Sequence, residues 1–241
     1  MRIREATSDE DLNEAALIQR EVWNVQDIDI VGPIEMKALQ HAGASVLLAE
    51  MDDGAVAGFS YAFPAFVKGE TFWHSDLLAV RPAYRGGQVG QRLKWAQRDH
   101  ALSRGIKRIT WTFDPMQAGN ANLNLEWLGA TAGEYLPNFY GVTTSALHHG
   151  LPTDRLLASW ELESPRVAAR AHGAPRATEA REASVAIPDA WNDLVKRDPE
   201  KARQEQRRVA SEIQSALGQG LVITGFDKAA SSYVFSRPER A

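Results

Sequence analysis

A glycine-rich segment between a predicted strand and a predicted helix is the part of the sequence best suited to chemistry. It runs from Val80 to Lys94 and reads VRPAYRGGQVGQRLK. Glycines let successive backbone N–H groups point into one concavity, and the positive end of the helix dipole adds attraction for an anion. The spacing matches neither a Walker loop nor a dinucleotide-binding G-x-G-x-x-G. The segment predicts a phosphate cradle, with a plain strand-to-helix turn as the alternative.

The predicted strand before this segment, residues 71–80, carries side chains suited to acid–base work. If no bulge intervenes, one face of the strand presents Phe72, His74, Asp76, Leu78 and Val80. An imidazole with a pKa of about 6.5 can remove a proton at neutral pH, and a carboxylate on the same face would favour a usable pKa. His74 and Asp76 are therefore catalytic candidates, with a structural His–Asp pair as the alternative. His74-Ser75-Asp76 is not a hydrolase triad, because adjacent strand residues point to opposite faces.

The composition is that of an ordinary globular protein, with 44% apolar and 24% charged residues in a chain of 241. The 27 Lys and Arg and 31 Asp and Glu leave a formal net charge of −4, so no global charge favours nucleic acid or an anionic membrane. The absence of cysteine excludes disulfides, thiolate zinc sites and a cysteine nucleophile. No apolar run has the length of a membrane span, and the start lacks the core of a secretory signal. We expect a cytoplasmic enzyme or binding protein.

Strand and helix patterns alternate along residues 1–163. Ser8 and Asp11 form a capping-box pattern before one helix, and Pro33 suits the first turn of the next. The predicted strands are 3–5, 45–50, 55–63, 71–80, 108–113, 131–135 and 156–163, and the later predicted helices are 90–104 and 120–128. The predicted order is therefore β-α-α-β-β-β-α-β-α-β-β.

The composition changes between residues 164 and 184, where Ala and Arg dominate and Val167 is the one large aliphatic residue. Such a segment buries little, so we expect a linker over 164–184. The tail that follows, 185–241, is too short for a robust core of its own. It contains a predicted helix that starts at Asp198-Pro199-Glu200 and predicted strands over 221–226 and 232–235. We expect this helix–hairpin extension to dock on residues 1–163 or on a partner chain.

The element order and the glycine-rich segment resemble the GCN5-related N-acetyltransferase (GNAT) superfamily. Its signature is Arg or Gln, two residues, Gly, one residue, then Gly or Ala, between the fourth strand and third helix of this fold. Arg85 and Gly90 occupy the outer positions, whereas Gln88 stands where the first glycine is expected and Gly87 is displaced by one. The segment 127–130, WLGA, looks like the family's Leu-Gly-Phe helix end.

Two further segments, 134–141 and 150–156, resemble a poorly characterised bacterial branch of these acetyltransferase-like proteins. The resemblance implies an α/β fold with a mixed, mostly antiparallel central sheet flanked by helices, here followed by the C-terminal α+β extension. The residues expected to form the GNAT domain are 1–163. The branch motifs carry no information about the substrate.

The resemblance also implies transfer of an acyl group, expected to be acetyl, from acyl-CoA to an amine, with no metal. The glycine-rich backbone would hold the pyrophosphate, and the end of the preceding strand would pair with the pantetheine arm. The cofactor-binding candidates are Leu78, Ala79, Val80, Arg85, Gly86, Gly87, Gln88, Val89, Gly90 and Asn120. Gln88 can still donate its backbone N–H if its φ is negative. The expected partners are acyl-CoA and an unidentified amine, without nucleic acid or membrane, and a homodimer stays open.

The family's usual acid, a Tyr four residues before the glycine that ends the fourth helix, corresponds here to Leu125. Tyr140 and Tyr135 are substitutes by residue type, and structural tyrosines are the alternative. The missing tyrosine favours a CoA-binding sensor or interaction protein without transfer activity, whereas His74, placed where some members have a glutamate base, favours the enzyme. His148 and His149 have no further ligand at metal-site spacing, so we interpret them as part of a solvated loop.

Overall fold

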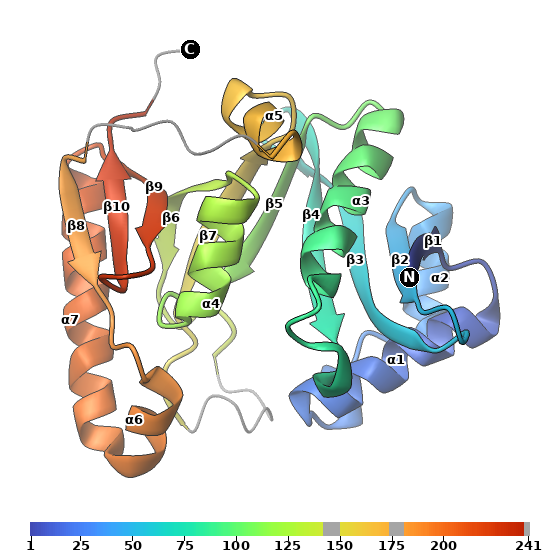
Figure 1. The fold of residues 1–241 in the computed structure, drawn as a ribbon, viewed down its shortest axis with the longest axis horizontal. Helices are drawn as coiled ribbons and strands as arrows, with labels where there is room; N and C mark the ends of the chain where they lie inside the picture. The colour runs from blue at the N-terminus through green and yellow to red at the C-terminus, as the bar shows by residue number, and fades with distance from the viewer. Residues whose placement is uncertain (142–149, 174–180, 239–241) are drawn as a thin grey trace. The chain divides into compact units, whose positions relative to one another are not determined.

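The computed structural model describes residues 1–141, 150–173 and 181–238 (Figure 1). His148 and His149 lie outside the described residues. Contacts divide the chain into two units, the first covering residues 1–111 and the second the described residues from 112 onward. Within the described part, no helix combines the length and the apolarity needed to cross a membrane.

The first unit contains the strands in the order β1-β2-β3-β4-β5. They are β1 (Arg2–Glu5), β2 (Ser45–Glu50), β3 (Val56–Val67), β4 (Glu70–Val80) and β5 (Arg108–Phe113), the last two residues of which belong to the second unit. The helical elements are α1 (Asp9–Trp23), η1 (Asp27–Asp29), α2 (Pro33–His41), η2 (Pro82–Tyr84) and α3 (Val89–Ser103). Neighbouring strands are antiparallel except for the parallel pair β4–β5.

Local signals explain how α1 begins. The Ser8 hydroxyl accepts a hydrogen bond from the Asp11 backbone N–H at 3.2 Å, and the Asp11 carboxylate accepts one from the Ser8 N–H at 3.3 Å. This is the predicted capping box, which satisfies two N–H groups that a helix start leaves without partners. The Arg4 guanidinium also binds Asp11 and lowers the pKa of that carboxyl to about 2. The capping-box prediction is confirmed.

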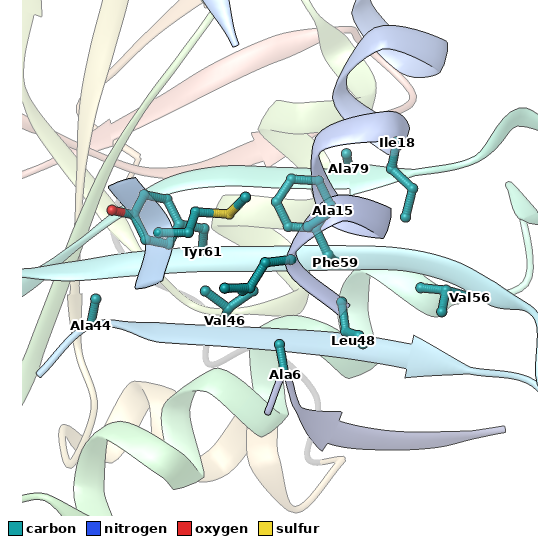
Figure 2. Close-up of a cluster of buried hydrophobic side chains, with 12 residues drawn as sticks. Ala6, Ala15, Ile18, Ala44, Val46, Leu48, Val56, Phe59, Tyr61 and Ala79 are labelled. Atoms are coloured by element: carbon teal, nitrogen blue, oxygen red, sulfur yellow. The ribbon is translucent and has the colours of Figure 1, made fainter. Parts of the chain in front are cut away.

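Helices cover both faces of the first sheet. On one face lie α1 and α2, and Figure 2 shows Ala15 and Ile18 of α1 over the strand residue Phe59. On the other face, Val89 and Leu93 of α3 pack on the sheet. The strand side chains of this second cluster are Leu47, Ala49 and Ala57. Both faces of the strands are therefore buried by helices, and β4 lies between the two apolar layers.

The second unit contains the strands in the order β7-β6-β9-β10-β8, all antiparallel to their neighbours. They are β6 (Thr131–Leu136), β7 (Arg155–Glu161), β8 (Ala183–Ala186), β9 (Val222–Asp227) and β10 (Ser232–Ser236). The helices are α4 (Ala118–Ala121), the π-helix η3 (Asn122–Trp127), α5 (Pro165–Ala171), α6 (Trp191–Arg197) and α7 (Pro199–Gly218). Within this unit, β9 of the tail pairs with β6 through Ala132 and Ile223.

The mixed, mostly antiparallel sheet with flanking helices is confirmed, together with a C-terminal region that follows the predicted GNAT elements. The segment 164–184 differs from the expected linker, because Ser164 caps α5 and Val167 is buried. Residues 174–180 of this segment lie outside the described residues. The helix predicted over 120–128 consists of α4 and η3. Neither β8 nor α6 was predicted from the sequence.

Candidate functional site

A β-bulge interrupts β4 at Asp76. Tyr61 of β3 pairs with Leu77 and Ala62 pairs with Ser75, so Asp76 is an extra residue between two paired positions. A bulge shifts the alternation of the side chains that follow it. After the bulge, Leu77 and Ala79 pack in the cluster with α1 and α2, whereas Leu78 and Val80 pack on the α3 side.

The bulge corrects the prediction that one face of the strand carries every second residue from Phe72 to Val80. The His74 ring lies 5.6 Å from that of Phe63, which packs against the α1 and α2 cluster. Leu78 and Val80 therefore point to the opposite face from His74. The condition of a strand without a bulge is not met, so the alternation expected from Phe72 does not hold beyond Asp76, because the extra residue changes the register with β3.

The strands β4 and β5 part soon after they meet. In the described residues their pairing covers Trp73 with Ile109 and His74 with Thr110. From Ser75 to Val80, β4 pairs with β3 on one side, and on the other side it pairs with none of the described residues of β5. We call the point where the strands part, next to Ser75 and Trp111, the fork. An open strand edge of this kind offers backbone N–H and C=O groups to an extended ligand.

The segment Arg85–Gly90, which we call the glycine loop, connects this edge to α3. Gly86 has φ +83° and Gln88, the N-cap residue of α3, has φ +59° and ψ 12°. The condition of a negative φ at Gln88 is therefore not met, and the backbone of Gln88 adopts the left-handed region that favours glycine. The first N–H groups of α3 and its dipole still make this loop suited to an anion. Arg85 braces the loop, since its Nε donates to the Val80 carbonyl at 3.2 Å.

Glycines 58 and 90 differ in what a side chain would meet. A Cβ at Gly58 would lie 2.4 Å from the Ala79 carbonyl oxygen, so β3 and β4 approach too closely for any other residue. A Cβ at Gly90 would lie 3.6 Å from a Val80 methyl and 3.9 Å from a Leu78 methyl, which are ordinary contacts. The packing of the protein alone therefore requires glycine at position 58 and not at position 90.

His74 is held at the end of the β4–β5 pairing. Its Nδ1 lies 2.9 Å from the Thr110 hydroxyl, and the side chain is partly buried. Burial first, and then the charge of Lys94, lowers the pKa of His74. Burial and then Glu35 raise the pKa of Asp76. The pKa of His74 is thus lowered, whereas a neighbouring Asp76 carboxylate was expected to raise it. A lowered pKa favours the neutral imidazole, which is the form that accepts a proton.

Lys94 is a functional candidate that the sequence analysis missed. Its side chain is buried against β4 and β5: Nζ donates to Ser75 Oγ at 3.1 Å and to Gln97 Oε1 at 2.8 Å, and lies 3.8 Å from the Trp111 ring centre. Burial lowers the pKa of this ammonium well below its usual range. The signal was available, because Lys94 and Gln97 fall within the buried stripe of α3 that begins at Val89.

Tyr140 and Asn120 belong to the second unit, whereas the other site candidates belong to the first. Tyr140 is 45% exposed, and its hydroxyl lies 2.8 Å from that of Thr112. Asn120 is exposed on α4. Tyr135 is buried and donates to Asp154 at 2.8 Å, which accounts for its hydroxyl structurally. Leu125, at the position of the family's tyrosine, is fully buried.

The comparisons with known proteins agree with this architecture. Residues 9–126 match the model of the acetyltransferase (GNAT) family. No curated protein matches the chain.

Solved structures of several acetyltransferases share the fold. Aminoglycoside 6'-acetyltransferase type Ii has 20% identity and a TM-score of 0.53 over 68% of this chain and 99% of its own. The protein yncA from Salmonella typhimurium, solved with its cofactor acetyl-CoA, has 20% identity and a TM-score of 0.53 over 68% of this chain and 95% of its own. The ribosomal-protein-S18-alanine N-acetyltransferase from Escherichia coli has 17% identity and a TM-score of 0.52 over 68% of this chain and 94% of its own.

Proposed function

Because the chain belongs to the acetyltransferase (GNAT) family, we propose that it is an acyl-CoA-dependent N-acyltransferase that transfers an acyl group, most simply acetyl, to an amine. The observation that carries the proposal is the continuity of the open β4 edge with the glycine loop at the start of α3. The relatives named above act on an aminoglycoside and on a protein alanine. Their variety leaves the acceptor open.

The glycine loop is assigned to the pyrophosphate of acyl-CoA. The backbone N–H groups of Gly86, Gly87, Val89 and Gly90 and the positive end of α3 suit a phosphate, whereas the positive φ of Gln88 leaves its N–H out of this set. The loop residues from Arg85 to Gln88 are exposed, so Gln88 stays a proposed contact through its exposed position. The edge formed by Leu78, Ala79 and Val80 is assigned to the pantetheine arm, which would pair with it as an added strand. Packing within the protein does not require a glycine at position 90. A glycine there fits a pyrophosphate that lies close to the backbone of the glycine loop. Asn120 stays a proposed cofactor contact on α4.

His74 is assigned as the base that removes a proton from the acceptor ammonium, directly or through one water. Its lowered pKa keeps the imidazole neutral at pH 7, so it can accept that proton. The Thr110 hydroxyl bound to Nδ1 fixes the ring, and Nε2 is then the atom that takes the proton. Asp76 is kept as the next residue to test as the base, and Tyr140 stays a proposed catalytic residue by its type.

A CoA-binding sensor without transfer activity is the second candidate. The observation that favours it is Leu125, a fully buried apolar residue where the family's usual tyrosine acid is expected. The enzyme proposal is favoured by the half-buried, neutral His74 beside the fork. In either case the partners proposed are acyl-CoA and, for the enzyme, an amine; a cytoplasmic location and the absence of nucleic-acid and membrane partners stay predictions.

Turnover of acetyl-CoA, followed by release of free CoA thiol, separates the two candidates. The purified chain is incubated with acetyl-CoA and a panel of amines that includes aminoglycosides, polyamines, amino acids and peptides with a free N-terminus. The enzyme proposal predicts thiol release that depends on one class of amine and is lost in His74→Ala. CoA binding without release for any amine would favour the sensor.

A further inference from the structure

The ammonium of Lys94 lies at the fork. Ser75 and Trp111 are the residues that follow the last paired positions, His74 and Thr110, on their two strands. Lys94 reaches both from α3, because its Nζ donates to Ser75 Oγ at 3.1 Å and lies 3.8 Å from the Trp111 ring centre. A third contact, to Gln97 Oε1 at 2.8 Å, comes from the next turn of α3. A buried lysine is therefore fixed where β4 and β5 part.

The reacting end of acyl-CoA would reach the same place, if the proposed function is right. The glycine loop follows Val80 directly, so an arm that starts there and runs along the open edge passes Leu78 and approaches Ser75. At a rise of about 3.3 Å per residue, the five steps from Val80 to Ser75 span roughly 17 Å. An extended pantetheine chain is of comparable length, which brings its sulfur to the fork.

We propose that Lys94 is the acid of the transfer reaction, with its Nζ–H directed at the sulfur of bound acyl-CoA. The inference rests on the proposed function and supplies the proton donor that Leu125 does not provide. His74 packs on the side of α1 and α2, whereas Lys94 comes from α3 on the opposite side of β4. The acceptor amine is deprotonated on one side, and the leaving sulfur receives its proton on the other.

The bonds and protons balance in this scheme. The amine nitrogen, deprotonated by His74, forms a bond to the thioester carbonyl carbon, and the carbon–sulfur bond breaks with its electron pair on sulfur. A proton moves from Lys94 Nζ to that sulfur, which leaves as the CoA thiol. Lys94 becomes a neutral amine, the form that burial favours. After the carbon–sulfur bond breaks, the amide nitrogen still carries one extra proton, which it loses to solvent. The proton held by His74 is also released to solvent, and Lys94 takes one proton back from solvent. The net reaction converts one acyl-CoA and one ammonium into one amide, one CoA thiol and one released proton.

The groups around Lys94 set its charge. From β4, the titratable neighbour is His74, whose pKa the charge of Lys94 lowers. Its contacts from α3 and β5 include the Gln97 amide and the Trp111 ring. Asp76 lies at the bulge of β4, and its own pKa is raised by burial and by Glu35. Burial is the cause that lowers the pKa of Lys94, so the ammonium gives up its proton more readily than an exposed lysine.

The test measures the thiol of bound CoA and needs no acceptor. CoA is bound at saturation to the wild-type chain, and ultraviolet absorbance of the thiolate is followed from pH 6 to 10, with desulfo-CoA as the reference that cancels tyrosine ionisation. A cation facing the sulfur lowers the apparent thiol pKa from its free value of about 8.5. Lys94→Met should raise it by about one pH unit or more relative to wild type. The matched control is Lys37→Met on the exposed face of α2, where Lys37 pairs with Asp9.

Lys94→Met keeps the length of the side chain but removes the donor to Ser75 Oγ and Gln97 Oε1, which costs stability when the acceptors stay buried, so the fold of the variant is checked by circular dichroism. Lys94→Gln, which keeps a polar donor without the charge, gives the same measurement if Lys94→Met does not fold. A thiol pKa that is equal in wild type and in the Lys94 variants, with CoA bound to each, overturns the role of Lys94 and leaves the proposed function standing. Failure of the wild type to bind CoA overturns both.

Discussion

The close approach of β3 and β4 at Gly58 gives a stability prediction that needs no ligand. A Cβ there would lie 2.4 Å from the Ala79 carbonyl oxygen and 3.1 Å from the Val80 Cα, both of them backbone atoms. Backbone cannot rotate away as a side chain would, so Gly58→Ala must push β4 from β3. Ala79 and Val80 belong to the edge assigned to the pantetheine arm, so the same change should also weaken CoA binding.

The cost of such overpacking in a well-packed core is about 1–3 kcal/mol. For a chain of this size, one kcal/mol corresponds to roughly 2–4 °C in Tm. Gly58→Ala should therefore lower Tm by about 2–12 °C. Urea unfolding should give a lower midpoint with an unchanged slope, since the surface exposed on unfolding stays the same.

Gly90→Ala is the matched control for this measurement. Its added methyl would meet only side-chain carbons at 3.6 and 3.9 Å, and alanine is favoured over glycine within a helix by about 1 kcal/mol. Without CoA, Gly90→Ala should melt at or above the wild-type temperature. If Gly58→Ala has the same Tm as the wild type, or if Gly90→Ala lowers Tm as much as Gly58→Ala does, the close approach of β3 and β4 at Gly58 is wrong.

The glycine loop, the base and the tail each give one further expected outcome. Gln88→Gly should raise Tm by a few degrees, because it relieves left-handed strain of about 1 kcal/mol; a lower Tm would contradict the φ of Gln88. His74→Ala should lower turnover about 10²–10⁴-fold. Because the pKa of His74 is lowered, the acid limb of the wild-type pH profile of kcat/KM should lie below about pH 6.5, and this limb should vanish in the variant. An acid limb that His74→Ala retains would place the base elsewhere. A chain truncated after Glu163 loses buried side chains of α7, β9 and β10, each of which stabilises the fold by about 1.5–3 kcal/mol. Residues 112–163 should then no longer unfold cooperatively. Equal stability of the truncated and the full chain by calorimetry would refute docking of the tail.

The order of the elements could be predicted because it depends on local signals. Ser8 and Asp11 cap α1, and Asp198 caps α7 by accepting from the Lys201 N–H at 3.0 Å. Pro33 at the first turn of α2 acts in the same local way. The short elements β8 and α6 were missed, since four to seven residues carry too little periodicity to be read from the sequence alone.

The geometry of the candidate site depends on partners distant in sequence, and the sequence could not supply it. The bulge at Asp76 follows from the register of β4 with β3, while the alternation of residues along β4 gives no sign of it. The left-handed Gln88 occupies a position where glycine would be the expected residue. The helical spacing from Val89 places Lys94 on the buried stripe of α3, but a lysine on a helix is usually solvent-exposed, so this signal was not followed until the contacts with Ser75 and Trp111 showed the burial of Lys94. The roles of His74, Asp76 and Tyr140 stay predictions.

Calorimetric titration of CoA into the wild-type chain and into Gly90→Asp tests the central claim, that the glycine loop and the β4 edge bind acyl-CoA. An aspartate near the start of α3 suits the helix dipole, so the variant should fold, but its charge would repel the pyrophosphate. We expect saturable binding to the wild type and binding at least tenfold weaker, about 1.4 kcal/mol, to Gly90→Asp. No binding to the wild type, or equal affinity for the two proteins, would contradict the assignment of this loop.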